Sequence, residues 1–130
     1  MQDARVILVV DDEESVRLLL STLLERDSYT VLVANDGQHA LEVARRHAGE
    51  ISALVTDYKM PHLNGLELAR TLVAERPEMR VMIMSGRVSN PEALQRCGFP
   101  MLSKPFTITT FLNSLKQCLE SPPRWQSGQA

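Results

Sequence analysis

Short apolar runs alternate with amphipathic segments along most of the chain. Five runs rich in Val, Ile, Leu and Met predict β-strands, at residues 5–10, 29–34, 51–56, 80–84 and 100–103. The first, third and fourth runs are almost continuously apolar, which is typical of central parallel strands covered on both faces. The pattern therefore predicts a β-sheet whose central strands are buried.

Between these runs, apolar residues recur at the three- and four-residue spacing of an α-helix. Asn35 or Asp36 is a plausible N-cap for the second helix, and Thr107 for the last. The segment "NPEALQRC", residues 90–97, leaves room for only about two helical turns, so we expect a short fourth helix. The other predicted helices cover residues 14–26, 36–47, 64–75 and 107–120. We expect their apolar stripes to pack in the core: Val16, Leu19, Leu20, Leu23, Leu24, Ala40, Leu41, Ala44, Leu66, Ala69, Leu72, Val73, Ile108, Phe111, Leu112, Leu115 and Leu119.

Strands that alternate with helices predict right-handed crossovers and a parallel sheet. We therefore expect an α/β fold, a single doubly wound (βα)5 domain, and the length of 130 residues fits one domain. The tail "SPPRWQSGQA", residues 121–130, is rich in Pro, Ser and Gln and is predicted to be disordered or a linker.

Overall charge and the remaining composition narrow the function classes. A formal charge of -2 gives no support for nucleic-acid binding. Cys97 and Cys118 lack the density of a disulfide framework and the spacing of metal ligands, so both are interpreted as reduced thiols. His39, His47 and His62 are expected at the surface. The sequence shows neither a signal peptide nor a transmembrane run, which predicts a cytoplasmic protein without a membrane partner.

Polar residues follow four of the five predicted strands. Asp11 and Asp12 end the first strand, Asp57 the third, Ser85 the fourth and Lys104 the fifth. Each residue alone has an ordinary explanation as a helix cap, a turn or a solvated side chain. Doubly wound sheets, however, bind ligands beyond the carboxyl ends of their strands. The joint placement of these side chains therefore predicts a site at that edge.

Electrostatics indicates what this site holds. Two unit charges about 4 Å apart repel by about 4 kcal/mol at an effective dielectric constant of about 20. Three clustered aspartates would then carry on the order of 10 kcal/mol of repulsion, comparable to the stability of a whole domain. Protonation, separation of the carboxylates or a bound cation would relieve this repulsion, and a divalent cation suits the set, because Mg²⁺ (or Mn²⁺) prefers such oxygen ligands. Glu13 and Glu14 are expected to remain solvated at a helix N-terminus.

An aspartate beside a divalent cation, a hydroxyl and an ammonium group can attack a phosphoryl donor and form an aspartyl phosphate. Asp57 is the predicted nucleophile, because it ends the middle strand and can face the acids that end the first. The metal and Lys104 would neutralise the oxygens of the transferred group.

These residues resemble the receiver domain of two-component response regulators over about residues 4–120. The resemblance rests on "VILVVDDEE", "ALVTDYKMPHLNGLEL", "VMIMSG" and "LSKPF", in that order. It implies a receiver domain at residues 1–120 with a flavodoxin-like parallel sheet of strand order 2-1-3-4-5. It also implies a signalling domain rather than an enzyme, because only Mg²⁺-assisted self-phosphorylation and autodephosphorylation are expected.

The resemblance assigns roles to particular residues. Asp57 is similar to the phosphoacceptor, Asp11 and Asp12 to the acids that bind Mg²⁺ together with it, and the backbone carbonyl of Lys59 to a further ligand. Ser85 resembles the hydroxyl that contacts the phosphoryl group, and Lys104 its ion-pair partner. Pro105 resembles a cis-proline that aims this lysine, and Gly65 is expected to permit a turn forbidden to larger residues.

Two features depart from the usual family pattern. Met101 stands where an aromatic switch residue is common, and Ser85 to Lys104 spans only 19 positions. Lys59 and Arg87, two residues after Asp57 and Ser85, are candidates for tuning the phosphoryl lifetime or simply solvated cations. The compact C-terminal half is similar to receivers attached to hybrid histidine kinases.

The implied phosphodonor is a histidine kinase or a histidine phosphotransfer protein, and a homodimer is a further expectation. A second hypothesis is a receiver-like docking module that works without phosphorylation. A phosphoester hydrolase is disfavoured because "DDEE" lacks the Asp-x-Asp arrangement of that class. A flavin site is disfavoured because acids replace a phosphate-binding loop after the first strand.

Overall fold

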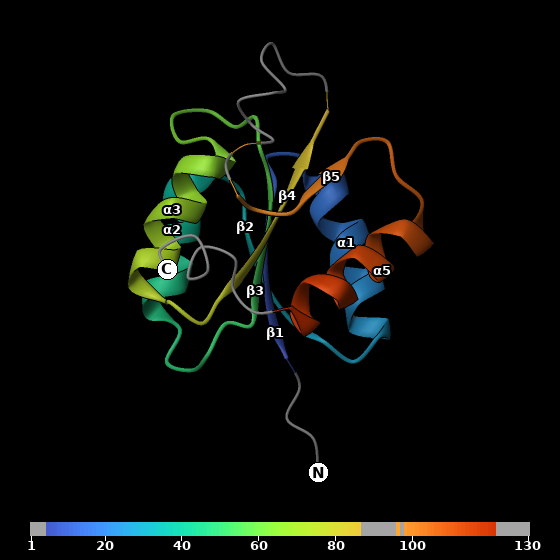
Figure 1. Ribbon diagram of the computed structural model, residues 1–130. Helices are drawn as coiled ribbons and strands as arrows, with labels where there is room; N and C mark the ends of the chain where they lie inside the picture. Colours follow the sequence, from blue (N-terminus) through green and yellow to red (C-terminus); the bar gives the residue numbers. More distant parts are fainter. Residues whose placement is uncertain (1–4, 87–95, 97, 122–130) are drawn as a thin grey trace.

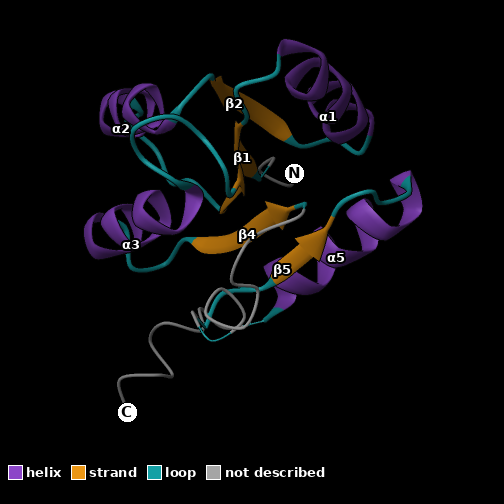
Figure 2. Ribbon diagram, turned by 90° about the horizontal axis from the view of Figure 1, so that it is seen from above, coloured by secondary structure: helices purple, strands orange, loops and turns teal. Residues whose placement is uncertain are grey.

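The predicted parallel sheet is present in a computed structural model of the chain, which describes residues 5–86, 96 and 98–121. The five strands are all parallel and lie in the order β2-β1-β3-β4-β5, as expected. Figure 2 shows the strands between two layers of helices. The strands are β1 (Val6–Val10), β2 (Thr30–Ala34), β3 (Ala53–Asp57), β4 (Arg80–Ser85) and β5 (Met101–Ser103).

Helices cover both faces of this sheet. α2 and α3 lie on one side, and α1 and α5 lie on the other (Figure 1). The four predicted ranges agree with the observed helices to within one residue at either end. The segment predicted to form a short fourth helix, including Cys97, lies outside the described residues except for Arg96. The helices are α1 (Glu14–Arg26), α2 (Gly37–Arg46), α3 (Gly65–Glu75) and α5 (Ile108–Glu120).

The alternation of side chains along the strands divides the core into two layers. Leu8 and Val10 of β1 pack with α2 and α3, whereas Ile7 and Val9 pack with α1 and α5. Each layer therefore depends on residues from every central strand. Met101 is half-buried against the first layer.

Two residues that the sequence placed in the core are exposed instead. Leu19 is 52% exposed, next to Leu18 at 61%. The contact face of α1 is centred on Leu20 and Leu24, and Leu19 lies on its flank, so the predicted stripe was too wide. Ile108 is 52% exposed because it is the first residue of α5, and helical side chains lean toward the N-terminus, here past the end of the helix.

Side chains cap three of these helices. Asp36 rather than Asn35 caps α2, where its carboxylate accepts from His39 N at 2.8 Å, and Thr107 caps α5 as predicted. Asn64 and Glu67 form a capping box at α3. Glu13, the N-cap of α1, makes no such side-chain hydrogen bond.

The histidines were expected at the surface, and Cys118 was expected to be a reduced thiol. His62 is exposed, whereas His39 and His47 are half-buried. Cys118 is a free, buried thiol in α5, and burial raises its pKa to about 11. Within the described residues, no helix is both long and apolar enough to cross a lipid bilayer.

Arg76 joins the end of α3 to the end of α2. Its guanidinium donates to the carbonyls of Ala44, His47 and Gly49 at 2.8–2.9 Å. We expect Arg76→Met to lower the free energy of unfolding by about 2 kcal/mol, because three carbonyls lose a charged donor. Urea denaturation measures this loss against Arg70→Met, which removes an exposed arginine of the same helix. Equal stability of the two variants would contradict the prediction.

Candidate functional site

The polar residues at the strand ends meet at one edge of the sheet. Asp11 directly follows β1, Asp57 and Ser85 are the last residues of β3 and β4, and Lys104 directly follows β5. Because parallel strands end at the same edge, their C-terminal residues converge even though the sequence separates them widely. The predicted convergence of Asp11, Asp12, Asp57 and Lys104 is confirmed by the distances that follow.

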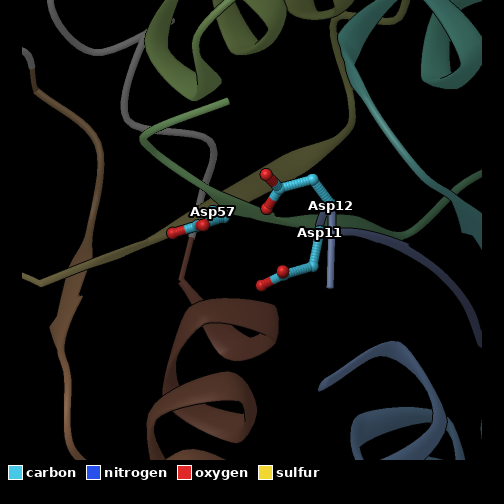
Figure 3. Close-up of side chains that lie close together, drawn as sticks. All are labelled: Asp11, Asp12 and Asp57. Atoms are coloured by element: carbon cyan, nitrogen blue, oxygen red, sulfur yellow. The ribbon is translucent and has the colours of Figure 1, made fainter. Parts of the chain in front are cut away.

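Three carboxylates form the centre of this site. One ligand oxygen from each of Asp11, Asp12 and Asp57 lies within 4.8 Å of the others. Figure 3 shows the three side chains gathered beyond the ends of β1 and β3. Asp11 is fully buried and Asp57 is 9% exposed, whereas Asp12 is open to solvent. The group is therefore buried on one side and accessible on the other.

Lys104 is the cation that pairs with this group. Its Nζ lies 3.3 Å from Asp57 Oδ1 and 3.6 Å from Asp11 Oδ2. Its backbone N–H donates to Ser85 O at 2.8 Å, and the following bond to Pro105 is cis, as expected. The backbone thus holds the lysine at the edge where its side chain can face two strands.

Asp11 leaves one buried oxygen without a hydrogen bond. Its Oδ1 accepts from Glu13 N at 2.9 Å, but its Oδ2 has no hydrogen-bond donor. The ion pair with Lys104 at 3.6 Å is longer than a hydrogen bond. A buried carboxylate oxygen normally has a partner, so Asp11 Oδ2 is an available ligand atom.

Burial shapes the protonation of all three paired groups. Burial raises the pKa of Asp11 and of Asp57. At Asp11 it outweighs the hydrogen bond from Glu13 N–H and the Lys104 ammonium, and at Asp57 it outweighs the Lys104 ammonium. Burial lowers the pKa of Lys104, but the carboxylates of Asp57 and Asp11 together raise it further, so the net shift is upward. An added cation would favour the ionised carboxylates.

The loop between β3 and α3 is held close to Asp57 by Gly65. A Cβ atom on Gly65 would lie 2.3 Å from Asp57 O and 3.0 Å from Tyr58 Cα. The backbone N–H of Gly65 donates to Tyr58 O at 2.8 Å. Larger residues are excluded at this turn, as expected, but the reason is the close approach of two backbones, because the φ of Gly65 is not positive. The Lys59 side chain in this loop is exposed.

Ser85 is buried at the same edge of the sheet, at the end of β4. It is 8% exposed, and its hydroxyl donates to Gly86 O at 3.2 Å. The hydroxyl therefore has a local partner in this structure. Arg87, the candidate tuning residue that follows, lies outside the described residues.

Comparison with known proteins identifies this arrangement. Residues 7–116 match the family model of the response regulator receiver domain. The chain belongs to this family. A receiver domain is a signalling module rather than a catalytic enzyme, and receiver domains belong to two-component systems, which implies histidine kinase partners.

Relatives of the receiver domain differ in what accompanies it. The response regulator receiver protein CpdR of Brucella abortus is 31% identical over 116 residues, covering 87% of this chain and 95% of CpdR. The response regulator MprA of Mycobacterium leprae is 35% identical over 116 residues, covering 87% of this chain but 50% of MprA. The sensor kinase CckA of Brucella abortus is 30% identical, covering 92% of this chain and 13% of CckA. The chain therefore spans half or less of the length of several curated relatives.

Solved structures show the same fold. A response regulator receiver protein from Sinorhizobium medicae superimposes with a TM-score of 0.81 at 26% identity, covering 92% of this chain and 97% of that one. A receiver domain protein from Clostridium thermocellum gives a TM-score of 0.78 at 28% identity, covering 88% and 94%. The flavodoxin-like fold of this receiver domain is thus shared with proteins of the same family.

The acidic group of this receiver domain fits a divalent cation. Three ionised carboxylates opposite one ammonium leave two negative charges without compensation, the charge that Mg²⁺ or Mn²⁺ would balance. The donor atoms are hard oxygens, and the unpartnered Asp11 Oδ2 is among them. Asp11, Asp12 and Asp57 of this receiver domain are therefore suited to hold a divalent metal ion.

Sequence reasoning missed two residues that contact the aspartates. Thr56 is fully buried, and its hydroxyl donates to Asp57 O at 2.9 Å. Arg17 of α1 donates from Nη1 to Asp11 O at 2.7 Å. A possible signal for Arg17 was its position: it is the single basic residue in the first three turns of α1 and stands close to a run of acids.

Proposed function

We propose that this receiver domain accepts a phosphoryl group on Asp57 from a phosphohistidine and thereby switches a protein-interaction surface. The supporting observation is the pairing of Lys104 with both Asp57 and Asp11, with Asp12 in the same group. The donor is a histidine kinase or a histidine phosphotransfer protein. Adding about 1.5 to 2 negative charges at Asp57 changes the balance among these side chains.

The chemistry is an in-line phosphoryl transfer. A carboxylate oxygen of Asp57 forms a bond to phosphorus while the phosphorus–nitrogen bond of the donor breaks. The electron pair of that bond returns to the imidazole nitrogen, which takes up a proton. Lys104 lies 3.3 Å from Asp57 Oδ1 and neutralises charge on the phosphoryl oxygens. When bound, Mg²⁺ would supply further neutralisation and would align the transferred group.

Other residues have supporting roles in this proposal. The backbone carbonyl of Lys59 would be a further oxygen ligand of Mg²⁺, and Pro105 orients Lys104 through the peptide bond between them. The Ser85 hydroxyl leaves Gly86 O and contacts the phosphoryl group. Met101 takes the switch position, and Arg87 and the Lys59 side chain tune the phosphoryl lifetime.

The setting of the receiver domain is also part of the proposal. We take residues 1–120 as the receiver domain and residues 121–130 as a tail or linker, located in the cytoplasm. The matching region of CckA makes a hybrid kinase one plausible context, and CpdR a stand-alone regulator another. The downstream effector is another protein surface rather than a nucleic acid or a membrane, with a homodimer as one form of that contact.

Incubation with acetyl phosphate and Mg²⁺ tests the chemistry. We expect a mass gain of one phosphoryl group that is stable in acid and lost in base, and peptide mapping should place it on Asp57. Chelation of Mg²⁺ with EDTA should reduce labelling at least about tenfold, because carboxylates without a cation repel the donor. Equal labelling with EDTA, or a label on another peptide, would contradict the proposal.

A phosphorylation-independent docking module is the second candidate. Met101 in place of an aromatic residue favours it, because the usual coupling of hydroxyl and aromatic side chain is altered. Beryllofluoride, which mimics the phosphoryl group, separates the two functions. Partner affinity that is unchanged by beryllofluoride supports the docking module, and a change in affinity supports the switch.

A further inference from the structure

Arg17 is held against the backbone between the two acids that follow β1. Its Nη1 lies 2.7 Å from the carbonyl oxygen of Asp11, a short hydrogen bond from a charged donor. The side chain is half-buried, so the contact is only partly open to water. A surface arginine that is freely solvated would not be fixed in this way.

The position of this carbonyl determines what the contact controls. The carbonyl belongs to the planar peptide unit that joins Asp11 to Asp12. The orientation of that plane sets the backbone dihedral angles on its two sides, and these angles direct the two carboxylates relative to each other. A donor that fixes the plane therefore fixes both acids at once.

Asp11 is held at two further atoms. Its N–H donates to Ala34 O at 3.3 Å, and its Oδ1 accepts from Glu13 N at 2.9 Å. With the carbonyl bound to Arg17, the oxygen that remains without a hydrogen bond is the buried Oδ2, which faces Lys104. The three contacts together leave Asp11 Oδ2 as the oxygen directed into the acidic group.

Arg17 is also placed against the preference of its helix. It is the fourth residue of α1, near the N-terminus, where the helix dipole favours acids over cations. The N-cap residue Glu13 does not cap the helix with its side chain. A cation at this point is accounted for by the carbonyl it binds rather than by helix stability.

We propose that Arg17 is a positioning residue that orients the carboxylates of Asp11 and Asp12 for a divalent cation. The inference rests on the proposed Mg²⁺-dependent function, because it assigns Arg17 to the support of the same site. Arg17 does not contact the cation; it acts through the peptide unit. Loss of such outer contacts typically weakens metal binding by about 10- to 100-fold.

Calorimetric titration with Mg²⁺ tests this role in the full chain. We expect Arg17→Gln to raise the Kd for Mg²⁺ about tenfold relative to wild type. Arg26→Gln is the matched control, because it removes the same charge from the exposed last turn of the same helix and should bind as wild type does. Arg17→Lys keeps the charge but loses the planar geometry, and should raise the Kd about threefold.

Two further measurements distinguish a positioning role of Arg17 from other roles: the midpoint of thermal unfolding in EDTA, and the salt dependence of the Kd for Mg²⁺. A merely structural Arg17 would lower the metal-free midpoint without changing the Kd, and that result would overturn the inference. A difference between Arg17→Gln and Arg26→Gln that vanishes in about 0.5 M KCl, where charges are screened within about 4 Å, would also overturn it. If Arg17→Gln does not fold, an Arg17→Lys variant that binds as wild type does would overturn it.

The wild-type titration separates this inference from the proposed function. Wild type that binds no Mg²⁺ at millimolar concentration would overturn both. Wild type and Arg17→Gln that bind Mg²⁺ equally would overturn only the role of Arg17.

Discussion

Replacing Asp57 with asparagine is expected to abolish phosphoryl labelling and, at the same time, to stabilise the metal-free protein. Labelling is lost because an amide cannot act as the nucleophile. Stability rises because burial raises the pKa of Asp57, so its ionised form at neutral pH is costly in the folded state. The expected gain in the free energy of unfolding is on the order of 1 kcal/mol, since the lost ion pair with Lys104 offsets part of the relief.

The pH dependence gives an independent sign for this effect. A carboxyl whose folded pKa is raised binds protons more tightly in the folded than in the unfolded state. Above the folded pKa the ionised Asp57 carboxylate destabilises the fold by its full amount. As the pH falls through the folded pKa the carboxyl takes up a proton, and this destabilisation is relieved. In EDTA, the stability advantage of Asp57→Asn over wild type should be largest at neutral pH and should shrink as the solution becomes acidic.

Urea denaturation in EDTA measures both results, with mass spectrometry for the label. Glu42→Gln is the matched control, because it removes one exposed carboxylate from α2 on the surface. It should label as wild type does and change the free energy of unfolding by less than about 0.5 kcal/mol. An Asp57→Asn protein that is less stable than wild type in EDTA would contradict the prediction. It would show that the ion pair of Asp57 with Lys104 stabilises the fold by more than burial of the carboxylate destabilises it.

Replacing Gly65 with alanine is expected to destabilise the fold by about 3 kcal/mol or more. The new Cβ would lie 2.3 Å from Asp57 O, and the obstructing atoms belong to the backbone. A flexible side chain could move aside, but here β3 or α3 has to shift, which is the costly form of overpacking. Because Asp57 itself is displaced, labelling of the folded fraction should also slow.

Gly49→Ala is the matched control for this substitution. Its Cβ would meet only the His47 side chain, at 3.3 Å for the nearest atom, in an exposed loop. We expect the free energy of unfolding to change by less than about 0.5 kcal/mol. Chemical denaturation of both variants measures the difference, and equal stabilities would show that the close approach at Gly65 is not required.

The sequence predicted the sheet, four helices and the acidic group because each depends on local pattern. Apolar runs located the strands, and parallel topology brought Asp11, Asp57 and Lys104 together without any knowledge of distances. Relative burial was less predictable. Asp11 is buried and its neighbour Asp12 exposed, and that difference depends on how the loop after β1 leaves the sheet.

Contacts between side chain and backbone were not predictable from pattern. The role of Gly65 depends on how closely α3 approaches β3, and the contact of Arg17 with Asp11 O depends on the direction of α1. Neither quantity is encoded by periodicity. The same limit explains Leu19, whose spacing fits the core stripe although the helix turns it outward.

Three of the charged groups that meet at the sheet edge each precede the connection to a different helix. Asp11 leads into α1, Asp57 into α3 and Lys104 into α5. α1 and α5 cover one face of the sheet and α3 covers the other (Figure 1). Charge introduced at a single carboxylate therefore acts on connections to opposite sides of the molecule simultaneously, and neither side is electrostatically insulated from the other.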